Sequence, residues 1–320
     1  MYEYQTLLAY LPGWVQTLVA DQMDEIEEIA MDLGRPLAIR RRGRHQLYPR
    51  EVSKQDLDWL KHKIGRFRED GRAGIDGTLH RLSAIRDVEG KVIGVTIRVG
   101  RFVPGVAEPL RPHLLTSRGS LLLVGPPGVG KTTLLRDIVR LLAEVYGPKV
   151  VVVDTSSEIG GDGQIPHPAI APARRLPVPD PPAEHQHRIF HQAIANHGPE
   201  VVIADEIGYH KDVPVVQAAA RRGVRVVATA HGETALDLLE NPVMWPLLGE
   251  PDLKERRRRV RPVFQSLLEV RARGYFVLHA SLAEAIDALL DGQAPAGWPI
   301  GAPPNGTEGC PAAAGTSLPT

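Results

Sequence analysis

Two patterns of apolar and polar residues divide the chain near residue 105. Beyond residue 119, continuous apolar runs alternate with longer segments of helical spacing. The runs predict buried strands at residues 120–125, 149–154, 201–206 and 224–232, and two more strands are predicted within residues 264–279. The segments predict helices at residues 132–146, 184–196, 213–222 and 281–292. Apolar strands that alternate with helices are typical of a mostly parallel sheet covered on both faces, so an α/β domain is predicted.

The first 105 residues have a mixed pattern that predicts a smaller α+β domain. Helical spacing predicts three helices, at residues 6–22, 23–33 and 53–67. The third helix has Ser53 as its expected N-cap. A strand with a basic edge is predicted at residues 36–43. Residues 77–101 alternate apolar and polar positions on both sides of a Glu-Gly turn, which is typical of a β-hairpin.

The predicted organisation is an N-terminal domain at residues 1–105, a larger α/β domain at 106–291 and a tail at 292–320. A Pro-containing stretch at residues 102–115 reads as the connection between the domains. The tail is mostly Pro, Gly, Ala, Ser and Thr. We expect it to be disordered because it has little apolar surface to bury.

Composition narrows the class of protein. The chain is 43% hydrophobic and 24% charged, which is usual for a globular protein, and its 38 basic residues balance its 38 acidic residues. Nucleic-acid binding therefore has no support from net charge and would need a local patch. Cys310 is the single cysteine, so an intramolecular disulfide and a cysteine-based zinc site are excluded. No signal peptide or transmembrane segment is recognisable, and a cytoplasmic protein is expected.

The motif GPPGVGKT at residues 125–132 follows a predicted strand and precedes a predicted helix. This is the context of a phosphate loop (Walker A), whose backbone N–H groups and helix N-terminus bind the phosphates of a nucleotide. Lys131 is expected to bridge the β- and γ-phosphates of ATP, and Thr132 to bind Mg²⁺. The predicted ATP-binding residues are Gly125, Pro126, Pro127, Gly128, Val129, Gly130, Lys131, Thr132 and Thr133.

The strand VVIADE at residues 201–206 ends in two carboxylates, as a Walker B strand does. Asp205 would bind Mg²⁺, and Glu206 would orient or deprotonate the attacking water. In nucleotidases of this class, the next strand lies between this strand and the strand before the phosphate loop. Thr229 and His231, at the end of that next strand, are therefore candidate sensors of the γ-phosphate.

Other polar clusters support weaker hypotheses. His187 and His191 have an i, i+4 spacing that suits zinc, but no third ligand accompanies them, so a solvated helix face is favoured. The basic runs at residues 40–44 and 254–261 are interpreted first as solvated faces. In an ATPase ring, one arginine commonly reaches the neighbour's γ-phosphate. The candidates are Arg256, Arg257, Arg258 and Arg259, with Arg174 and Arg175 as rivals.

Several long stretches resemble a known family, that of stage III sporulation protein AA and the related cyanobacterial and plastid ATPases. The matching segments are DGRAGIDGTLHRLSAIRDVEGKVIGVTIRVGR, SLLLVGPPGVGKTTLLRDIVRLLAE, VVVVDTSSEIGGDGQIPHPAI, ARRLPVP, PEVVIADEIG, VVATAHG and RPVFQSLLEV. The resemblance implies an AAA+/RecA-like ATPase similar to secretion ATPases, acting as a homo-oligomer such as a hexameric ring, with possible docking to a larger complex. It also implies that Glu158, in DTSSEIGG, is a second catalytic or Mg²⁺-organising carboxylate. The cyanobacterial and plastid ATPases, which this chain resembles more closely, carry a nucleic-acid-binding domain with an Arg-x-x-x-His signature. That domain is not recognisable in this sequence.

The hypothesis from sequence is an Mg²⁺-dependent ATPase that drives conformational change in an oligomer. Its alternatives are a motor or repair factor that binds single-stranded nucleic acid, and a nucleotide-responsive scaffold without turnover. A GTPase is disfavoured because the chain has no N-K-x-D motif. A small-molecule kinase is disfavoured because the chain has the Asp-Glu pair and no evident acceptor pocket.

Overall fold

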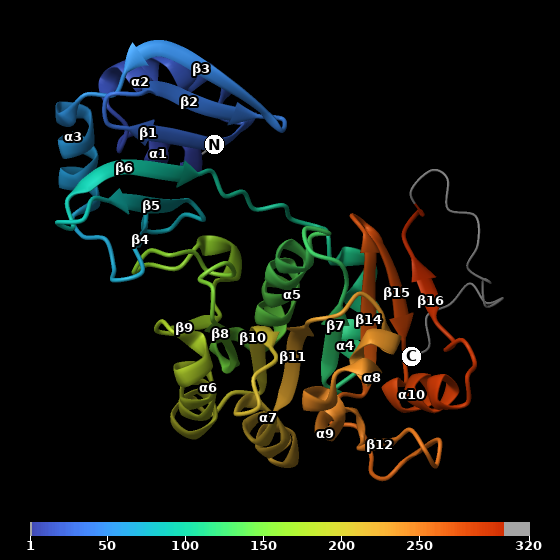
Figure 1. Ribbon diagram of the computed structural model, residues 1–320. Helices are drawn as coiled ribbons and strands as arrows, with labels where there is room; N and C mark the ends of the chain where they lie inside the picture. The colour runs from blue at the N-terminus through green and yellow to red at the C-terminus, as the bar shows by residue number, and fades with distance from the viewer. Residues whose placement is uncertain (1, 304–320) are drawn as a thin grey trace. The chain divides into compact units, whose positions relative to one another are not determined.

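The computed structural model describes residues 2–303, and the chain forms two compact units (Figure 1). Unit 1 comprises Met1–Phe102 together with Gly160–Pro168, and unit 2 comprises Val103–Ile159 and Ala169–Thr320. The first boundary lies in the Pro-containing stretch. The return of nine residues to unit 1 was not predicted from the sequence.

Unit 1 is an antiparallel sheet with helices packed on it. The strand order is β3-β2-β1-β6-β5-β4. The strands are β1 (Ile26–Asp32), β2 (Pro36–Arg41), β3 (Arg44–Glu51), β4 (Arg72–Gly74), β5 (Arg81–Arg86) and β6 (Val92–Arg98). The helices are α1 (Tyr2–Leu8), α2 (Gly13–Val19), η1 (Ala20–Gln22) and α3 (Lys54–Ile64). The predicted hairpin is β5–β6, and Ser53 caps α3 by accepting a hydrogen bond from the Asp56 N–H at 3.2 Å.

The expected helix at residues 23–33 was wrong, because this segment forms strand β1. Ile26 and Ile29 are three residues apart, which imitates helical spacing, yet both side chains are fully buried in the core of unit 1. The pairing of β1 with β2 shifts register between Ile26 and Glu28. This irregularity restarts the alternation of a strand, which then continues through Ile29 and Met31.

Unit 2 contains an eight-stranded sheet of order β16-β15-β14-β7-β11-β10-β8-β9. Its strands are β7 (Leu121–Val124), β8 (Val150–Asp154), β9 (Arg174–Pro177), β10 (Val201–Ile207), β11 (Arg225–Ala230), β14 (Ser266–Ala272), β15 (Tyr275–His279) and β16 (Trp298–Ile300). The strands from β14 to β9 in this order are parallel, and β15 and β16 are antiparallel. As predicted, β11 lies between β10 and β7.

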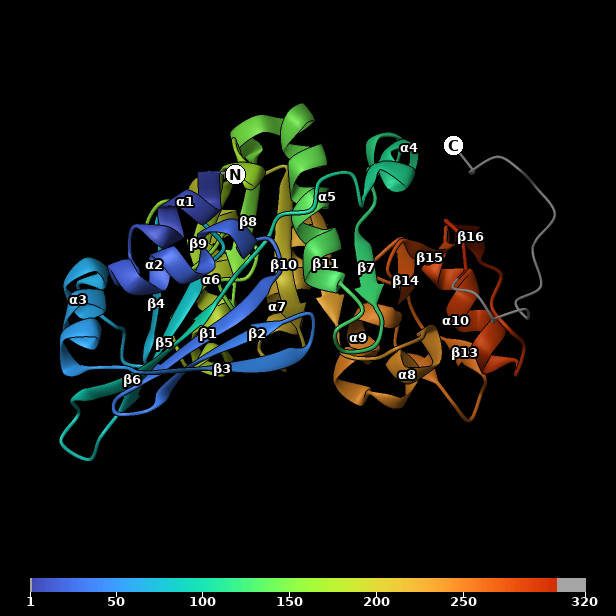
Figure 2. The ribbon, with the colours of Figure 1, turned by 90° about the horizontal axis from the view of Figure 1, so that it is seen from above.

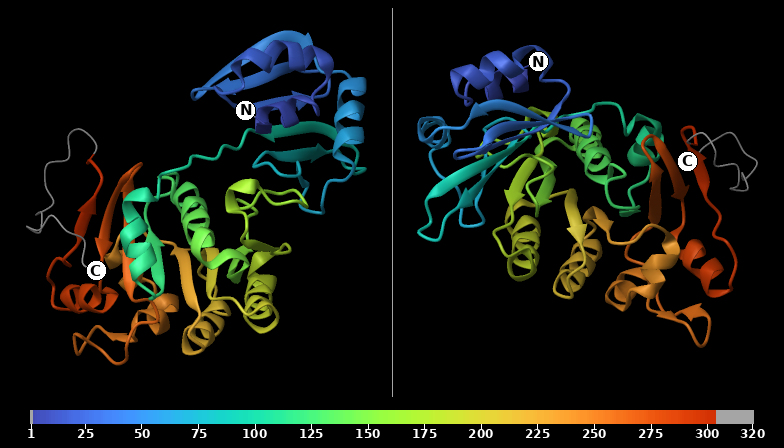
Figure 3. Two further views of the ribbon diagram at one scale, coloured as in Figure 1. Left: turned by 180° about the vertical axis from the view of Figure 1, so that it is seen from behind. Right: turned by 45° about the horizontal axis from the view of Figure 1, so that its top comes forward.

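Helices cover both faces of this sheet, as the pattern predicted (Figures 2 and 3). One face is covered by α4 (Arg111–Thr116) and α5 (Lys131–Tyr146). The other face is covered by α6 (Pro182–His197), α7 (Asp212–Arg221), α8 (Ala235–Glu240), α9 (Trp245–Leu248) and α10 (Leu282–Leu290). The short elements are η2 (Glu108–Leu110), η3 (Gly147–Lys149), η4 (Pro168–Ile170), η5 (Pro242–Met244), β12 (Pro251–Asp252) and β13 (Arg257–Arg258).

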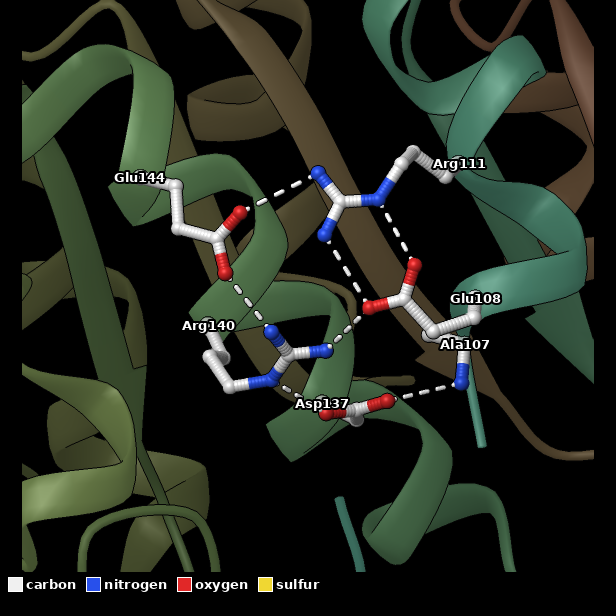
Figure 4. Close-up of polar contacts among 6 residues, drawn as sticks. All are labelled: Ala107, Glu108, Arg111, Asp137, Arg140 and Glu144. Carbon is white, nitrogen blue, oxygen red and sulfur yellow. Dashed lines mark hydrogen bonds and ion pairs between the residues drawn. The ribbon is translucent and has the colours of Figure 1, made fainter. Parts of the chain in front are cut away.

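An ion-pair network attaches the first residues of unit 2 to α5 (Figure 4). Asp137 is fully buried, and its carboxylate accepts a hydrogen bond from the Ala107 N–H at 2.8 Å and pairs with Arg140 at 2.7 Å. Arg140 also pairs with Glu108 at 2.9 Å, and Arg111 pairs with Glu108 at 2.6 Å. The two guanidinium groups lower the pKa of Glu108 to about 2.

The returning segment Gly160–Pro168 is built into unit 1. Asp162, with a side chain 1% exposed, pairs with Arg68 at 2.6 Å and with Arg81 at 3.0 Å. Asp76 accepts hydrogen bonds from the N–H groups of Gln164 at 2.6 Å and of Ile165 at 3.1 Å. The approach requires glycine at position 74, where a Cβ would lie 2.2 Å from the Gly163 nitrogen.

Part of the predicted disordered tail is ordered. Residues 298–300 form β16, which pairs with β15, and Ile300 is buried. Pro299 is tolerated because β16 is an edge strand. The remainder of that prediction, residues 304–320, lies outside the described residues. Among the described residues, none of the helices has the length and apolar character that crossing a bilayer requires.

Candidate nucleotide-binding site

The phosphate loop connects the end of β7 to the start of α5. Gly128 and Gly130 have φ angles of 75° and 110°, a region that favours glycine. At Gly125 the constraint is space, because a Cβ there would lie 2.5 Å from the Val270 carbonyl oxygen. The sequence therefore folds into the tight loop that a phosphate-binding site requires.

Lys131 is the first residue of α5, and its ammonium group lies over the loop. It donates hydrogen bonds to the carbonyl oxygens of Gly125 and of Pro126, the latter at 3.1 Å. Burial lowers the pKa of Lys131, against the opposing influence of the Glu206 and Glu233 carboxylates. The positive charge is thus held at the loop itself.

Thr132 and Glu158 meet beside the loop. The Thr132 hydroxyl donates a hydrogen bond to the Glu158 carboxylate at 3.1 Å. Thr133 lies next to Thr132 in the first turn of α5. A hydroxyl and a carboxylate this close are hard oxygen donors of the kind that Mg²⁺ prefers, so these residues fit a magnesium ion.

Asp205, at the end of β10, holds the loop that follows β8. Its two carboxylate oxygens accept hydrogen bonds from the N–H groups of Thr155 at 3.0 Å and Ser156 at 2.8 Å. Asp154, at the end of β8, accepts a hydrogen bond from the Ile159 N–H at 3.1 Å. Burial, and then the neighbouring Asp154 carboxylate, raise the pKa of Asp205 to about 7. The two acidic strand ends therefore belong to one site.

Glu206 and His231 come together at the exposed side of the site. The imidazole Nε2 of His231 contacts Glu206 Oε1, and their side chains are 82% and 42% exposed. The segment after β11 also binds the phosphate loop, because the Gly125 N–H donates a hydrogen bond to the Gly232 carbonyl oxygen at 2.8 Å. Thr229 is placed differently, since its buried hydroxyl donates to the Asp205 carbonyl oxygen.

Two buried residues of the site were missed by sequence reasoning. Gln186, on α6, accepts a hydrogen bond from the Thr155 hydroxyl at 3.0 Å and donates to the Glu206 carbonyl oxygen at 2.5 Å. Arg136, on α5, donates to main-chain carbonyl oxygens of the loop after β8. A signal exists in hindsight for Gln186, which precedes the buried Phe190 by four residues and so lies on the sheet-facing side of α6. Arg136 gives no such signal, because it shares a face of α5 with the polar residues Thr132 and Arg140.

The candidate trans-acting arginines have partners within the chain. Arg256 donates to the Leu290 carbonyl oxygen at 2.7 Å, and Arg257 pairs with Glu255 at 2.5 Å. Arg258 pairs with Asp287 at 2.6 Å, and Arg259 pairs with Asp252 at 2.7 Å. Arg258 shares a surface cavity with Ser120 and Arg225. It therefore lies at the edge where β7 and β11 begin, opposite the phosphate loop of its own chain.

The rival residues are also placed by the structure. Arg174 and Arg175 begin β9, at the edge of the sheet. His187 and His191 lie on α6. Within the described part of the chain, three or more His, Cys, Asp or Glu side chains are nowhere grouped to hold a metal ion.

The phosphate loop after β7, with Asp205 and Glu206 ending a strand two places away, defines a P-loop nucleoside-triphosphatase fold. Solved structures share it. The pilus retraction motor PilT with bound ADP matches with a TM-score of 0.56 and 14% identity over 87% of this chain and 89% of that chain. The Legionella pneumophila ATPase DotB matches with a TM-score of 0.51 and 17% identity over 80% of this chain and 75% of that chain.

Residues 72–260 match the family model described as "Sporulation stage III, protein AA", and the chain belongs to this family. Stage III sporulation protein AA of Bacillus subtilis (strain 168) is 30% identical over 254 residues, 71% of this chain and 80% of the relative. An "Uncharacterized protein ycf45" of Porphyra purpurea is 41% identical over 311 residues, 92% of this chain and 54% of the relative. "Protein SEEDLING PLASTID DEVELOPMENT 1" of Arabidopsis thaliana is 42% identical over 289 residues, 85% of this chain and 42% of the relative. The chain thus spans about half the length of these last two relatives.

Proposed function

We propose that this protein is an Mg²⁺-dependent ATPase that drives conformational change in a homo-oligomer, for which a hexameric ring is the expected form. The observation that carries the proposal is that Lys131 and the Thr132–Glu158 pair lie at one glycine-rich loop, while the Glu206 carboxylate, which contacts His231, lies near enough to influence the pKa of Lys131. Such a site supplies positive charge for the phosphates and carboxylates for a metal ion and a water.

The residues have distinct roles in this proposal. Lys131 and the N–H groups of residues 125–133 bind the β- and γ-phosphates of ATP. Thr132 and Asp205 hold Mg²⁺, which when bound neutralises charge on the phosphates. The hydrogen bonds from Thr155 and Ser156 to Asp205 orient that carboxylate toward the same loop that carries Glu158.

Glu206 is the proposed base that takes a proton from the attacking water. His231 contacts the Glu206 carboxylate and can hold it in place or bind the γ-phosphate. Glu158, through its bond to Thr132, organises the metal site from the other side. Thr229 contributes through the backbone of Asp205.

A neighbouring subunit would complete the site with one arginine of the stretch Arg256, Arg257, Arg258 and Arg259. The placement of Arg258 at the edge opposite its own phosphate loop supports action on a neighbour rather than in its own site. The exposed Arg257 and Arg259 side chains can exchange an acidic partner of their own chain for a phosphate.

The proposal is tested by measuring phosphate release from ATP, with Mg²⁺ and with EDTA, together with nucleotide affinity and mass in solution. Lys131→Ala should abolish turnover and weaken ATP binding. Glu206→Gln should keep ATP binding and lower kcat by about 10²–10⁴-fold. Lys91→Ala, an exposed lysine of the β5–β6 turn, is the matched control and should behave as wild type. The proposal would be overturned if the Lys131→Ala variant still hydrolysed ATP, or if the wild-type protein released no phosphate from ATP.

A further inference from the structure

Arg136 donates hydrogen bonds to the main chain at Glu158, the residue that carries the second carboxylate of the site. It lies on α5 and is 6% exposed. Its Nε donates to the Ile159 carbonyl oxygen at 2.9 Å, and its Nη2 donates to the Glu158 carbonyl oxygen. Arg136 thus binds the main chain of Glu158 and of the residue after it.

Thr132 holds the side chain of the same glutamate, through the bond to its carboxylate at 3.1 Å. Thr132 and Arg136 are four residues apart on α5, so their side chains lie on one face of the helix. One helix face therefore holds both the main chain and the carboxylate of Glu158. Helix α5 begins at Lys131, directly after the phosphate loop, so the helical backbone fixes the positions of Thr132 and Arg136 relative to that loop.

The rest of the loop is held from the sheet. Asp205 binds the N–H groups of Thr155 and Ser156, and Asp154 binds the N–H of Ile159. Ser157, which lies between Ser156 and Glu158, has a φ angle of 53°, which is uncommon for a residue other than glycine. The conformation at Glu158 is therefore imposed by its surroundings, and Arg136 supplies the attachment to the helix that carries Lys131.

We infer that Arg136 is a positioning residue: it fixes the backbone at Glu158 so that the carboxylate meets Thr132 at the phosphate loop. This inference rests on the proposed ATPase function. A guanidinium is suited to the role, because its rigid fork of donors reaches two carbonyl oxygens at once, whereas an ammonium acts as a single point charge. Arg136 acts on the nucleotide site through Glu158 and not by contact with the nucleotide.

The test compares Arg136→Gln, Arg136→Lys and Glu158→Gln for kcat, ATP affinity and thermal unfolding. Misplacing a group by about 1 Å can cost about 10²-fold, so Arg136→Gln should lower kcat by that order and leave ATP affinity unchanged. Arg136→Lys, which keeps the positive charge but has no planar fork of donors, should recover part of the loss. Arg98→Gln is the control, since the Arg98 side chain on β6 is 67% exposed, and it should keep wild-type kcat.

The double variant Arg136→Gln with Glu158→Gln decides between positioning and an independent role. If Arg136 acts through Glu158, the double variant loses no more kcat than Glu158→Gln alone. Losses that multiply, or an Arg136→Gln protein with wild-type kcat, would overturn the inference. If Arg136→Gln fails to fold, Arg136→Lys is used in the same cycle.

A readout without turnover separates this inference from the ATPase proposal. Hydrogen exchange of the Ile159 amide should become faster in Arg136→Gln, while exchange in the strands β10 and β11 stays unchanged. If wild-type protein releases no phosphate, the proposed function fails and this measurement alone decides whether Arg136 fixes the loop. If the exchange of Ile159 does not change, the positioning role is wrong.

Discussion

Asp205 belongs both to the fold and to the proposed chemistry. Its carboxylate accepts two main-chain hydrogen bonds from the loop after β8, and the same carboxylate is the expected Mg²⁺ ligand. The position of Asp205 at a strand end could be predicted from the apolar run before it. Its contacts with Thr155 and Ser156 could not, because they depend on β8 and β10 lying side by side, which the sequence order does not state.

The raised pKa of Asp205 predicts a pH dependence of stability. Its pKa is about 7 in the folded protein and 3.8 in the unfolded chain, so the folded state binds this proton more tightly. Stability from this source is complete below the unfolded pKa and is lost as the pH rises through about 7. In EDTA, the free energy of unfolding of wild type relative to Asp205→Asn should therefore fall between about pH 4 and pH 7. Urea unfolding across this range measures the difference. A difference that is constant or grows with pH would contradict the assignment.

The elements of the two units differ in how well the sequence predicts them. The strands of the unit 2 sheet that are buried on both faces, such as β8 and β10, are continuous apolar runs that only a parallel sheet accommodates readily. Strand β1 was mistaken for a helix because an irregularity interrupts its alternation. The phosphate loop was found from its motif, whereas Gln186 and Arg136 were missed because their partners are main-chain groups distant in sequence.

The ion-pair network on α5 makes a prediction about which of its members stabilises the fold. Asp137→Ala would leave the Ala107 N–H and the Arg140 guanidinium without a buried partner. Arg140 keeps its pairs with Glu108 and Glu144, so the main cost is the unsatisfied buried Ala107 N–H, which is typically about 1–3 kcal/mol. Glu144→Ala removes a carboxylate that is 44% exposed, which typically costs about 0–1 kcal/mol. Chemical unfolding of the two variants measures the contrast. Equal losses would mean that the network is stabilised by its exposed pairs.

At the scale of the whole molecule, the chain passes between the two units three times, after Phe102, after Ile159 and after Pro168. At two of these three connections, the residues that belong to unit 2 are bound to α5 by hydrogen bonds and ion pairs. The residues after Phe102 are held by Asp137 and Arg140, and Ile159 is held by Arg136. The helix that begins at the phosphate loop therefore anchors two of the three connections to unit 1. This supports the proposal that nucleotide turnover is converted into conformational change.

After Ile159 the chain enters unit 1 as the segment Gly160–Pro168, and the side chain that holds this segment there is Asp162. Its buried carboxylate pairs with Arg68 and Arg81 of unit 1, and Arg81 is itself 15% exposed. Asp162→Ala should raise the rate of proteolytic cleavage within residues 160–168 by about 10²-fold, because losing one partner of a buried pair costs about 3 kcal/mol and cleavage follows the open population. Limited proteolysis read by mass spectrometry measures the rate. Glu89→Ala, which removes the exposed partner of Lys91 in the same unit, is the control and should leave cleavage unchanged. Equal cleavage of Asp162→Ala and wild type would show that the segment is held by its main-chain bonds to Asp76 instead.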